Sequence, residues 1–184
     1  MAKVLDYIVY MTYDLHGQWD YNKKYAMPGC DGLSCLRSHV NMTETVNALS
    51  MVTKAGVPAN KIVVGVSSYG RSFEMTNADC HGPQCGFTGP GSSAKKGRCT
   101  DTNGYISNAE IDEIIRNAAM GGKRANTVQH FTDDSESQIL VYDNTHWVAY
   151  MDDGNKLRRK QKWSGLNFAG TTDWAVDRQY TRSL

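Results

Sequence analysis

Asp6-Tyr-Ile-Val-Tyr-Met-Thr-Tyr-Asp-Leu-His-Gly-Gln-Trp-Asp20 is the stretch that decides the fold of this chain. From Leu5 to Tyr13 both alternating faces are largely apolar, which predicts a buried strand of a parallel sheet covered on both sides. The apolar pattern stops at Tyr13 and Asp14, and a polar and aromatic loop follows. Because parallel α/β folds carry their chemistry at this end of their strands, we expect functional side chains here.

Composition limits the classes of protein to which the chain can belong. Its 184 residues, 40% of them hydrophobic, suffice for one domain or for part of a larger one. A net charge of +1 provides no basic field for nucleic acid or an anionic membrane, and no apolar run reaches membrane-spanning length. We therefore expect no nucleic-acid or membrane partner. Met1-Ala-Lys3 enters the first strand at once and leaves no room for a signal peptide, so a truncated chain is expected.

Five cysteines lie in loops rich in Gly, Pro, Ser and Asn: Cys30, Cys35, Cys80, Cys85 and Cys99. Such placement is typical of disulfides in secreted proteins, and the sequon Asn41-Met-Thr43 points to the same compartment. A zinc site would need a C-x-x-C pair or clustered histidines, and the sequence has neither. We expect no metal and no cofactor, one bridge between Cys30 and Cys35, one bridge between two of the other three cysteines, and one unpaired thiol.

A strand-helix-strand unit occupies the first part of the chain. Asn41 and Glu44 form a box-like helix start, and Gly56 and Pro58 stop this helix. The segment 61–70 then predicts a second strand, apolar throughout and polar only at its C-terminal end. The two strands are expected to be parallel with a right-handed crossover.

The middle of the chain breaks this rhythm and predicts a small α+β insertion. Ser107 and Glu110 form a capping box at the start of a helix, and short strands are expected near 128–131, 138–142 and 146–150. A basic helix over about 153–163 follows, and its run Lys156–Lys162 predicts a solvated face. A third core strand is expected over 166–176. The expected segments are 1–73, 74–152 and 153–184.

Four motifs, taken in order, resemble the chitinases of glycoside hydrolase family 18. Met11-Thr-Tyr-Asp14 resembles the Met-x-Tyr-Asp motif that ends the sixth strand of their (β/α)8 barrel. Tyr69-Gly-Arg-Ser-Phe73 is similar to the end of the seventh strand, and Gly104-Tyr-Ile-Ser107 resembles the opening of the insertion-domain helix. Gly170-Thr-Thr-Asp-Trp-Ala-Val-Asp177 resembles the eighth strand with its active-site tryptophan. Leu36-Arg-Ser-His-Val-Asn41 is most similar to the fungal, killer-toxin-like branch.

The resemblance implies an α/β fold: the last three strands of a (β/α)8 TIM barrel, with an α+β insertion between strands seven and eight. In this interpretation 1–73 holds strands six and seven, 74–152 is the insertion domain, and 153–184 holds the final helix and strand eight. The missing N-terminal barrel half would be a partner of this segment. The resemblance also implies a parent protein that is secreted.

The implied activity is hydrolysis of β-1,4-linked N-acetylglucosamine polymers by substrate-assisted retaining catalysis, in which the N-acetyl oxygen of the substrate attacks the anomeric carbon. By resemblance, Tyr13 would hydrogen-bond the acetamido group and Asp14 would bind the distorted sugar. Trp174 would stack under that sugar. The same pocket would be lined by Met11, Tyr69 and Arg71. The implied ligands are chitin or N-acetylglucosamine oligomers.

Each site residue also has an ordinary explanation, and one part of the family pattern is missing. Singly, Met11 is more often core filling, Tyr69 a satisfied core tyrosine and Trp19 a loop-packing residue. The five histidines are scattered and predict no acid-base pair. The acid motif Asp-x-x-Asp-x-Asp-x-Glu appears nowhere in this sequence, so the isolated chain is expected to be inactive. The alternatives are a non-catalytic chitin-oligomer-binding remnant and a truncated product without function.

Overall fold

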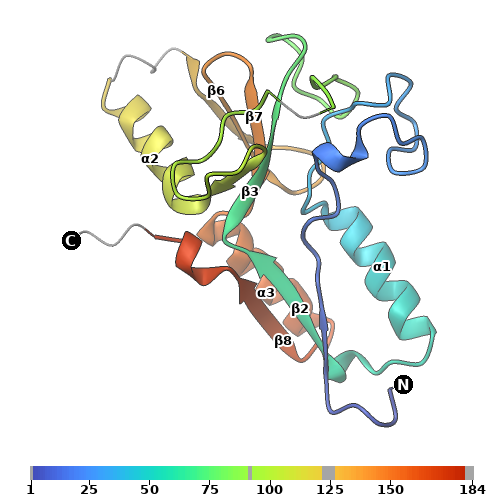
Figure 1. The fold of residues 1–184 in the computed structure, drawn as a ribbon. Coiled ribbons are helices and arrows are strands. Elements are labelled where there is room, and N and C mark those ends of the chain that lie inside the picture. The colour runs from blue at the N-terminus through green and yellow to red at the C-terminus, as the bar shows by residue number, and fades with distance from the viewer. Residues whose placement is uncertain (1, 91–92, 122–126, 181–184) are drawn as a thin grey trace.

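Two sheets organise the computed structural model, which describes residues 2–90, 93–121 and 127–180 (Figure 1). The first is a three-stranded parallel sheet in the order β1 (Ile8–Tyr10), β2 (Ile62–Ser67), β8 (Gly170–Trp174). The second is a five-stranded antiparallel sheet in the order β4 (Tyr105–Ser107), β3 (Tyr69–Glu74), β7 (His146–Tyr150), β6 (Gln138–Tyr142), β5 (Gln129–Thr132). The α-helices are α1 (Met42–Lys54), α2 (Asn108–Ala119) and α3 (Asp153–Gly165).

The strand β2 is the central strand of the parallel sheet, which agrees with its apolar sequence. Its Ile62 and Val64 pack in one cluster with Leu49 of α1 and Trp163 of α3. The helix α1 begins as expected, since the side chain of Asn41 accepts a hydrogen bond from the backbone N–H of Glu44 at 3.1 Å. The predicted parallel strand-helix-strand unit is therefore confirmed.

The strands β6 and β7 of the antiparallel sheet are buried on both faces, which explains their largely apolar sequences. In β6, Ile139 and Val141 contribute to one cluster, and Leu140 and Tyr142 contribute to a second cluster that also contains Ile111 of α2. Alternate residues of a strand point to opposite faces, so one strand serves two cores. The predicted capping box of α2 is present, with Ser107 and Glu110 hydrogen-bonded in both directions.

The expectation of a long, doubly buried first strand is wrong in this structure. β1 is only Ile8–Tyr10, and it pairs on one edge with β2. Tyr7, Val9 and Met11 are exposed. Among the described residues, no strand pairs with the other edge of β1 or covers its outward face, so the apolar sequence lacks the packing that its pattern predicts.

The expected second strand divides into two strands that belong to different sheets. β2 ends at Ser67, the chain turns at Ser68, and β3 begins at Tyr69. Figure 1 shows the chain running from the lower sheet directly into the upper one at this point. Tyr69 and Arg71 therefore begin an antiparallel strand instead of ending a parallel one, because their backbone groups pair with β4 and β7.

The predicted solvated face of the basic helix is also wrong in part. Arg159 of α3 is fully buried, and its guanidinium donates hydrogen bonds to Asn155 and to the carbonyl oxygens of Val40 and Glu136. Burial lowers the pKa of Arg159 to about 10. The side chain thus joins α3 to two loops, which spacing along the helix does not reveal.

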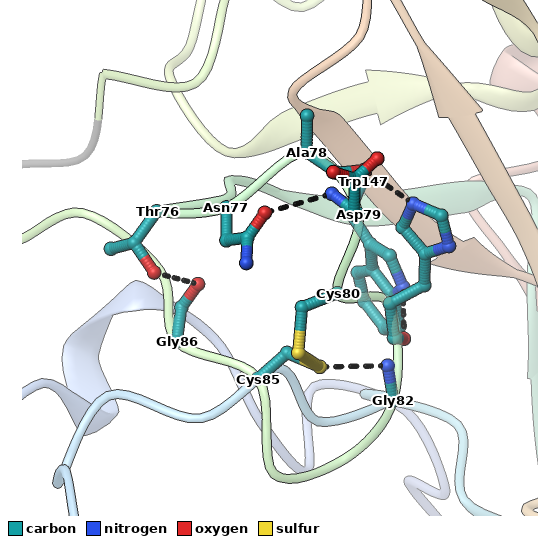
Figure 2. Close-up of a disulfide and its surroundings, with 10 residues drawn as sticks. Thr76, Asn77, Ala78, Asp79, Cys80, Gly82, Cys85, Gly86 and Trp147 are labelled. Carbon is teal, nitrogen blue, oxygen red and sulfur yellow. Dashed lines mark hydrogen bonds between the residues drawn. A yellow bond between two sulfur atoms is a disulfide. The ribbon is translucent and has the colours of Figure 1, made fainter.

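Both disulfides follow the prediction from the cysteine pattern. Cys30 bonds to Cys35 and Cys80 bonds to Cys85, which leaves Cys99 free and exposed. Figure 2 shows the second bridge in its loop, where the backbone N–H of Gly82 donates to the Cys85 sulfur at 3.1 Å. Trp147, also labelled there, donates its indole N–H to this loop. The acceptor is the carbonyl oxygen of His81, at 3.2 Å.

Candidate functional site

The carboxylate of Asp14 and the guanidinium of Arg71 form the centre of the candidate site. Asp14 follows β1 and has a φ of 58°, in the left-handed region that non-glycine residues rarely adopt. Arg71 donates from Nε to Oδ1 at 2.8 Å and from Nη2 to Oδ2 at 2.9 Å. Burial acts to raise the pKa of the Asp14 carboxyl, but its hydrogen bonds to Arg71 and the charge of the guanidinium outweigh burial and hold this pKa well below its usual range.

Three aromatic rings surround the guanidinium of Arg71. Its central carbon lies 5.0 Å from the ring centroid of Trp19, 5.4 Å from that of Tyr69 and 4.9 Å from that of Tyr105. Each distance is within the range of a cation-π interaction, and Trp19 remains partly exposed. The rings fix the plane of the guanidinium, so the two hydrogen bonds to Asp14 are held in a single geometry.

Tyr13 lies beside this centre with its ring against the parallel sheet. The ring is buried and meets Tyr69 edge to face, with centroids 6.2 Å apart. A Cβ at Gly65 of β2 would lie 2.7 Å from Tyr13 Cε1, so the glycine is required for this close approach. Burial, with the charges of Asp14 and Asp173, raises the pKa of the Tyr13 phenol. The phenol therefore stays protonated and able to donate a hydrogen bond.

The end of β8 is held by a second polar cluster. Asp173 accepts hydrogen bonds from Ser68 Oγ at 2.7 Å and from Lys156 Nζ at 2.8 Å. Lys156 also donates to Ser68 and Gln179, so all three of its protons are used. The backbone N–H of Ser68 donates a hydrogen bond to the carbonyl oxygen of Trp174, the residue after Asp173. Trp174 itself is 60% exposed.

A histidine anchors the loop that carries Trp19. His16 lies between Asp20, at 2.7 Å from Nδ1, and Glu44 of α1, at 3.0 Å from Nε2. Burial acts to lower the pKa of His16, but its hydrogen bonds to the two carboxylates outweigh burial and raise this pKa to about 9. The ring is therefore an imidazolium at neutral pH, and it ties the loop to the start of α1.

Not all of the predicted site residues meet. Tyr13, Asp14, Tyr69 and Arg71 form one contiguous cluster. Met11 and Trp174 lie at the same end of the parallel sheet, but their side chains are exposed, and within the described residues the indole makes no ring contact with that cluster.

Sequence reasoning missed three members of the cluster, Trp19, His39 and Tyr105. His39 lies in the stretch Leu36–Asn41, which was matched to the fungal branch without a role for the histidine, and its role depends on the contact with Asp14. Tyr105 belongs to a motif that was assigned to the start of a helix, but its ring lies 4.6 Å from that of Tyr69. A signal was present only for Trp19, which follows Asp14 within the quoted stretch.

The site shows no sign of metal chemistry in the part of the chain that the structure describes. No group of three or more His, Cys, Asp or Glu side chains there could hold a metal ion. No described helix is long and apolar enough to cross a membrane. The cluster offers a carboxylate, a phenol and the partly exposed indole of Trp19, and Trp174 exposes a second indole at the same end of the sheet; these groups suit hydroxyl, amide and C–H groups of a sugar.

A carboxylate and aromatic rings lie where the parallel strands end, the edge at which parallel α/β folds carry their active sites. The model of the glycosyl hydrolases family 18 matches residues 1–179, and the chain belongs to this family. The resemblance drawn from the four motifs is therefore confirmed.

Two curated relatives show how much of a longer protein this chain spans. It is 56% identical over 180 residues to "Secreted chitinase LysM12" of Penicillium expansum, covering 96% of this chain and 12% of the relative. It is 32% identical over 177 residues to "Killer toxin subunits alpha/beta" of Kluyveromyces lactis, covering 96% of this chain and 14% of the relative. The chain thus spans less than a fifth of the length of these relatives.

Solved structures show the same fold. A group IV chitinase of Ostrinia furnacalis superposes with a TM-score of 0.73 at 24% identity, covering 96% of this chain and 45% of that one. A family 18 chitinase of Cycas revoluta, solved in complex with (GlcNAc)3, superposes with a TM-score of 0.67 at 24% identity, covering 96% of this chain and 44% of that one. The mixed α/β fold is therefore that of known chitinases.

Proposed function

We propose that this chain is the C-terminal segment of a secreted chitinase. In this proposal β1, β2 and β8 are the last three strands of a (β/α)8 barrel, and the antiparallel sheet is the insertion between strands seven and eight. The family membership supports the reaction class, and the relative named a secreted chitinase supports the compartment. The unpaired edge and exposed apolar face of β1 support further strands beside it in the parent protein.

The observation that carries the proposal is the convergence of Tyr13, Asp14 and Arg71 where the parallel strands end. We assign the Tyr13 phenol to the acetamido group of the substrate, where its hydrogen bond would position the N-acetyl oxygen for attack on the anomeric carbon. Asp14, oriented by Arg71, would accept hydrogen bonds from the bound sugar, as would suit an ionised carboxylate. Met11 and Tyr69 would line the same pocket.

The general acid of the reaction is assigned to a part of the parent protein outside this chain. Asp14 cannot donate a proton at neutral pH, because its carboxyl has a strongly lowered pKa. Both oxygens of Asp173 already accept hydrogen bonds, from Ser68 and Lys156. By this proposal the 184-residue chain does not hydrolyse chitin by itself.

The direct test is the coding sequence upstream of Met1 in the source DNA and its transcripts. We expect an open reading frame that continues upstream and encodes Asp-x-x-Asp-x-Asp-x-Glu ahead of this segment. In-frame stop codons directly upstream, in both the gene and its transcripts, would contradict the proposal of a chitinase segment.

A second candidate, binding of chitin oligomers without cleavage, is favoured by one observation. Trp174 is 60% exposed at the end of β8 and offers a flat indole face beside the site. Calorimetric titration of this chain with (GlcNAc)4 tests it. Trp174→Ala should weaken binding at least about fivefold, whereas Tyr25→Ala, at a position 95% exposed in another loop, should not. Equal affinity of the wild type and Trp174→Ala would exclude stacking on this ring.

A further inference from the structure

His39 is fully buried and accepts hydrogen bonds from two successive backbone N–H groups of the loop that follows β1. The N–H of Asp14 donates to the Nδ1 atom of the His39 ring at 3.2 Å. The N–H of Leu15 donates to the backbone carbonyl oxygen of His39 at 3.1 Å. The segment just before α1 therefore holds the loop that follows β1, at the residue where the loop enters the left-handed region.

This geometry specifies the protonation state of the ring. Since Nδ1 accepts the Asp14 N–H, it carries a lone pair, and the proton of the neutral ring must be on Nε2. A proton on Nδ1 would face the Asp14 N–H, and the nearest carboxylate oxygen, Asp14 Oδ1, is 3.6 Å away, beyond hydrogen-bonding distance. Burial lowers the pKa of His39 and outweighs the opposing effect of Asp14, while the charges of Arg71 and Arg159 act in the same direction as burial. The ring is therefore neutral.

Packing alone does not account for an imidazole at this position. The ring stacks on Tyr69 with centroids 5.4 Å apart, and an apolar side chain of similar size could fill the same space. Among the residues that the structure describes, the buried Nε2 has no hydrogen-bond partner, and a buried donor without an acceptor is unfavourable. The function of the ring that an apolar residue could not supply is the acceptor at Nδ1.

We propose that His39 is the positioning residue of the Asp14 carboxylate. As a neutral Nε2–H tautomer, its Nδ1 binds the Asp14 N–H, holds this residue at its unfavourable φ and so directs the carboxylate toward Arg71. The sugar-binding role of the carboxylate rests on the proposed function, but the tautomer and the backbone contact do not.

The first measurement uses the unmodified 184-residue chain labelled with ¹⁵N. Long-range ¹H-¹⁵N correlations of the histidine rings report which nitrogen carries the proton. We expect the His39 ring to show an unprotonated Nδ1 and a protonated Nε2 at neutral pH, since burial lowers the pKa of the ring and Nδ1 accepts the Asp14 N–H. A protonated Nδ1 would overturn the inference, and this result needs no variant to fold.

The second measurement compares His39→Asn with His39→Leu. The Asn side-chain oxygen can occupy the position of Nδ1, whereas Leu supplies no acceptor, and both variants lose the ring stacked on Tyr69. In His39→Leu we expect hydrogen exchange of the Asp14 amide to accelerate about tenfold or more, and in His39→Asn we expect it to stay near the wild-type rate. Equal acceleration in both variants would mean that the ring acts only by packing.

Binding of (GlcNAc)4 then separates this inference from the proposed function. If the wild type binds, His39→Leu should bind about fivefold to tenfold more weakly and His39→Asn should recover most of that loss. If the wild type does not bind, the oligomer-binding function fails, while the tautomer and the exchange rates still decide the role of His39. Full binding by His39→Leu with a protected Asp14 amide would refute the role.

Discussion

Asp14 and Arg71 are 57 positions apart in the sequence, yet their side chains form two parallel hydrogen bonds of 2.8 and 2.9 Å. Asp14 follows the first strand of the parallel sheet, and Arg71 is part of the antiparallel sheet. The pair therefore joins the two sheets at the candidate site. The geometry is that of a planar fork facing a carboxylate, which lysine cannot reproduce.

Arg71→Lys should weaken this junction. The ammonium can form one hydrogen bond to Asp14 and loses the flat contacts with Trp19 and Tyr105, so we expect the free energy of unfolding to fall by about 1 kcal/mol. Both side chains of the original pair are partly exposed, which limits the effect. Urea denaturation measures it. As a control, Arg98→Lys, in an exposed pair with Glu113, should leave stability nearly unchanged; equal losses would contradict the special geometry of Arg71.

Gly17→Ala should displace the ring that covers Arg71. A Cβ at Gly17 would lie 2.3 Å from two ring atoms of Trp19, so the indole must move. We expect a loss of about 1 to 3 kcal/mol in the free energy of unfolding, as for other overpacked sites. Gly32→Ala is the matched control, because no atom of the described residues lies within 4 Å of its Cβ position. A neutral Gly17→Ala would show that the Trp19 ring is not held in this place.

The imidazolium of His16 predicts a loss of stability with rising pH. Its pKa is raised from 6.5 to about 9 in the folded state, so its contribution is fully present below pH 6.5 and is lost as pH rises through 9. The shift corresponds to about 1 to 3 kcal/mol, reduced because the Glu44 side chain is 43% exposed. Denaturation of wild type and His16→Gln at pH 6 and pH 9.5 measures it. The difference between the two proteins should shrink at the higher pH, and a constant difference would argue against a charged His16.

Hydrolysis should be absent from the isolated chain. The carboxyl of Asp14 is ionised and cannot protonate a leaving group, and the acid motif Asp-x-x-Asp-x-Asp-x-Glu is absent from this sequence. Incubation with (GlcNAc)4 and chromatography of the products should show no cleavage above a buffer blank. Activity that persists at constant specific rate through further purification would require an acid among the residues of this chain.

Four of the five cysteines should form disulfides, and the fifth should carry a free thiol. Peptide mapping of protein made in an oxidising compartment should find the Cys30–Cys35 and Cys80–Cys85 bridges. A thiol reagent should label one site per chain without denaturant, at the exposed Cys99. Five reactive thiols in such material would contradict both bridges.

Local patterns determined those parts of the fold in which near neighbours make the interactions. The box of Asn41 with Glu44 and that of Ser107 with Glu110 start their helices as expected, because a cap is formed within three residues. The paired runs over 138–142 and 146–150 form adjacent strands for the same reason. The Cys30–Cys35 bridge, which spans five positions, was predicted as a pair, whereas the structure decided that Cys80 bonds to Cys85 among the three remaining cysteines.

The same reasoning was less accurate where burial depends on distant segments. The apolar residues Tyr7, Val9 and Met11 predict a covered strand, but their exposure is decided by which strands stand beside β1. The break at Ser68 was not visible in the run of 61–70, because only the pairing of Tyr69 and Arg71 with β4 and β7 assigns them to the second sheet. From the sequence, Arg159 is predicted to be a solvated charge. Its burial depends on loops from other parts of the chain that cover it in the folded structure.

By itself, the sequence determined the family and four members of the central cluster, since Tyr13, Asp14, Tyr69 and Arg71 lie in short contiguous sequence motifs that can be recognised without a structure. Only the tertiary structure decided that Asp14 pairs with Arg71, that Trp19 and Tyr105 enclose the guanidinium, and that His39 accepts the Asp14 N–H. The physical reason is the separation along the sequence of the atoms that interact. Helix caps and turns are fixed by bonds between near neighbours, whereas the direction of a carboxylate and the tautomer of a buried ring depend on atoms that folding brings from 25 and 57 positions away.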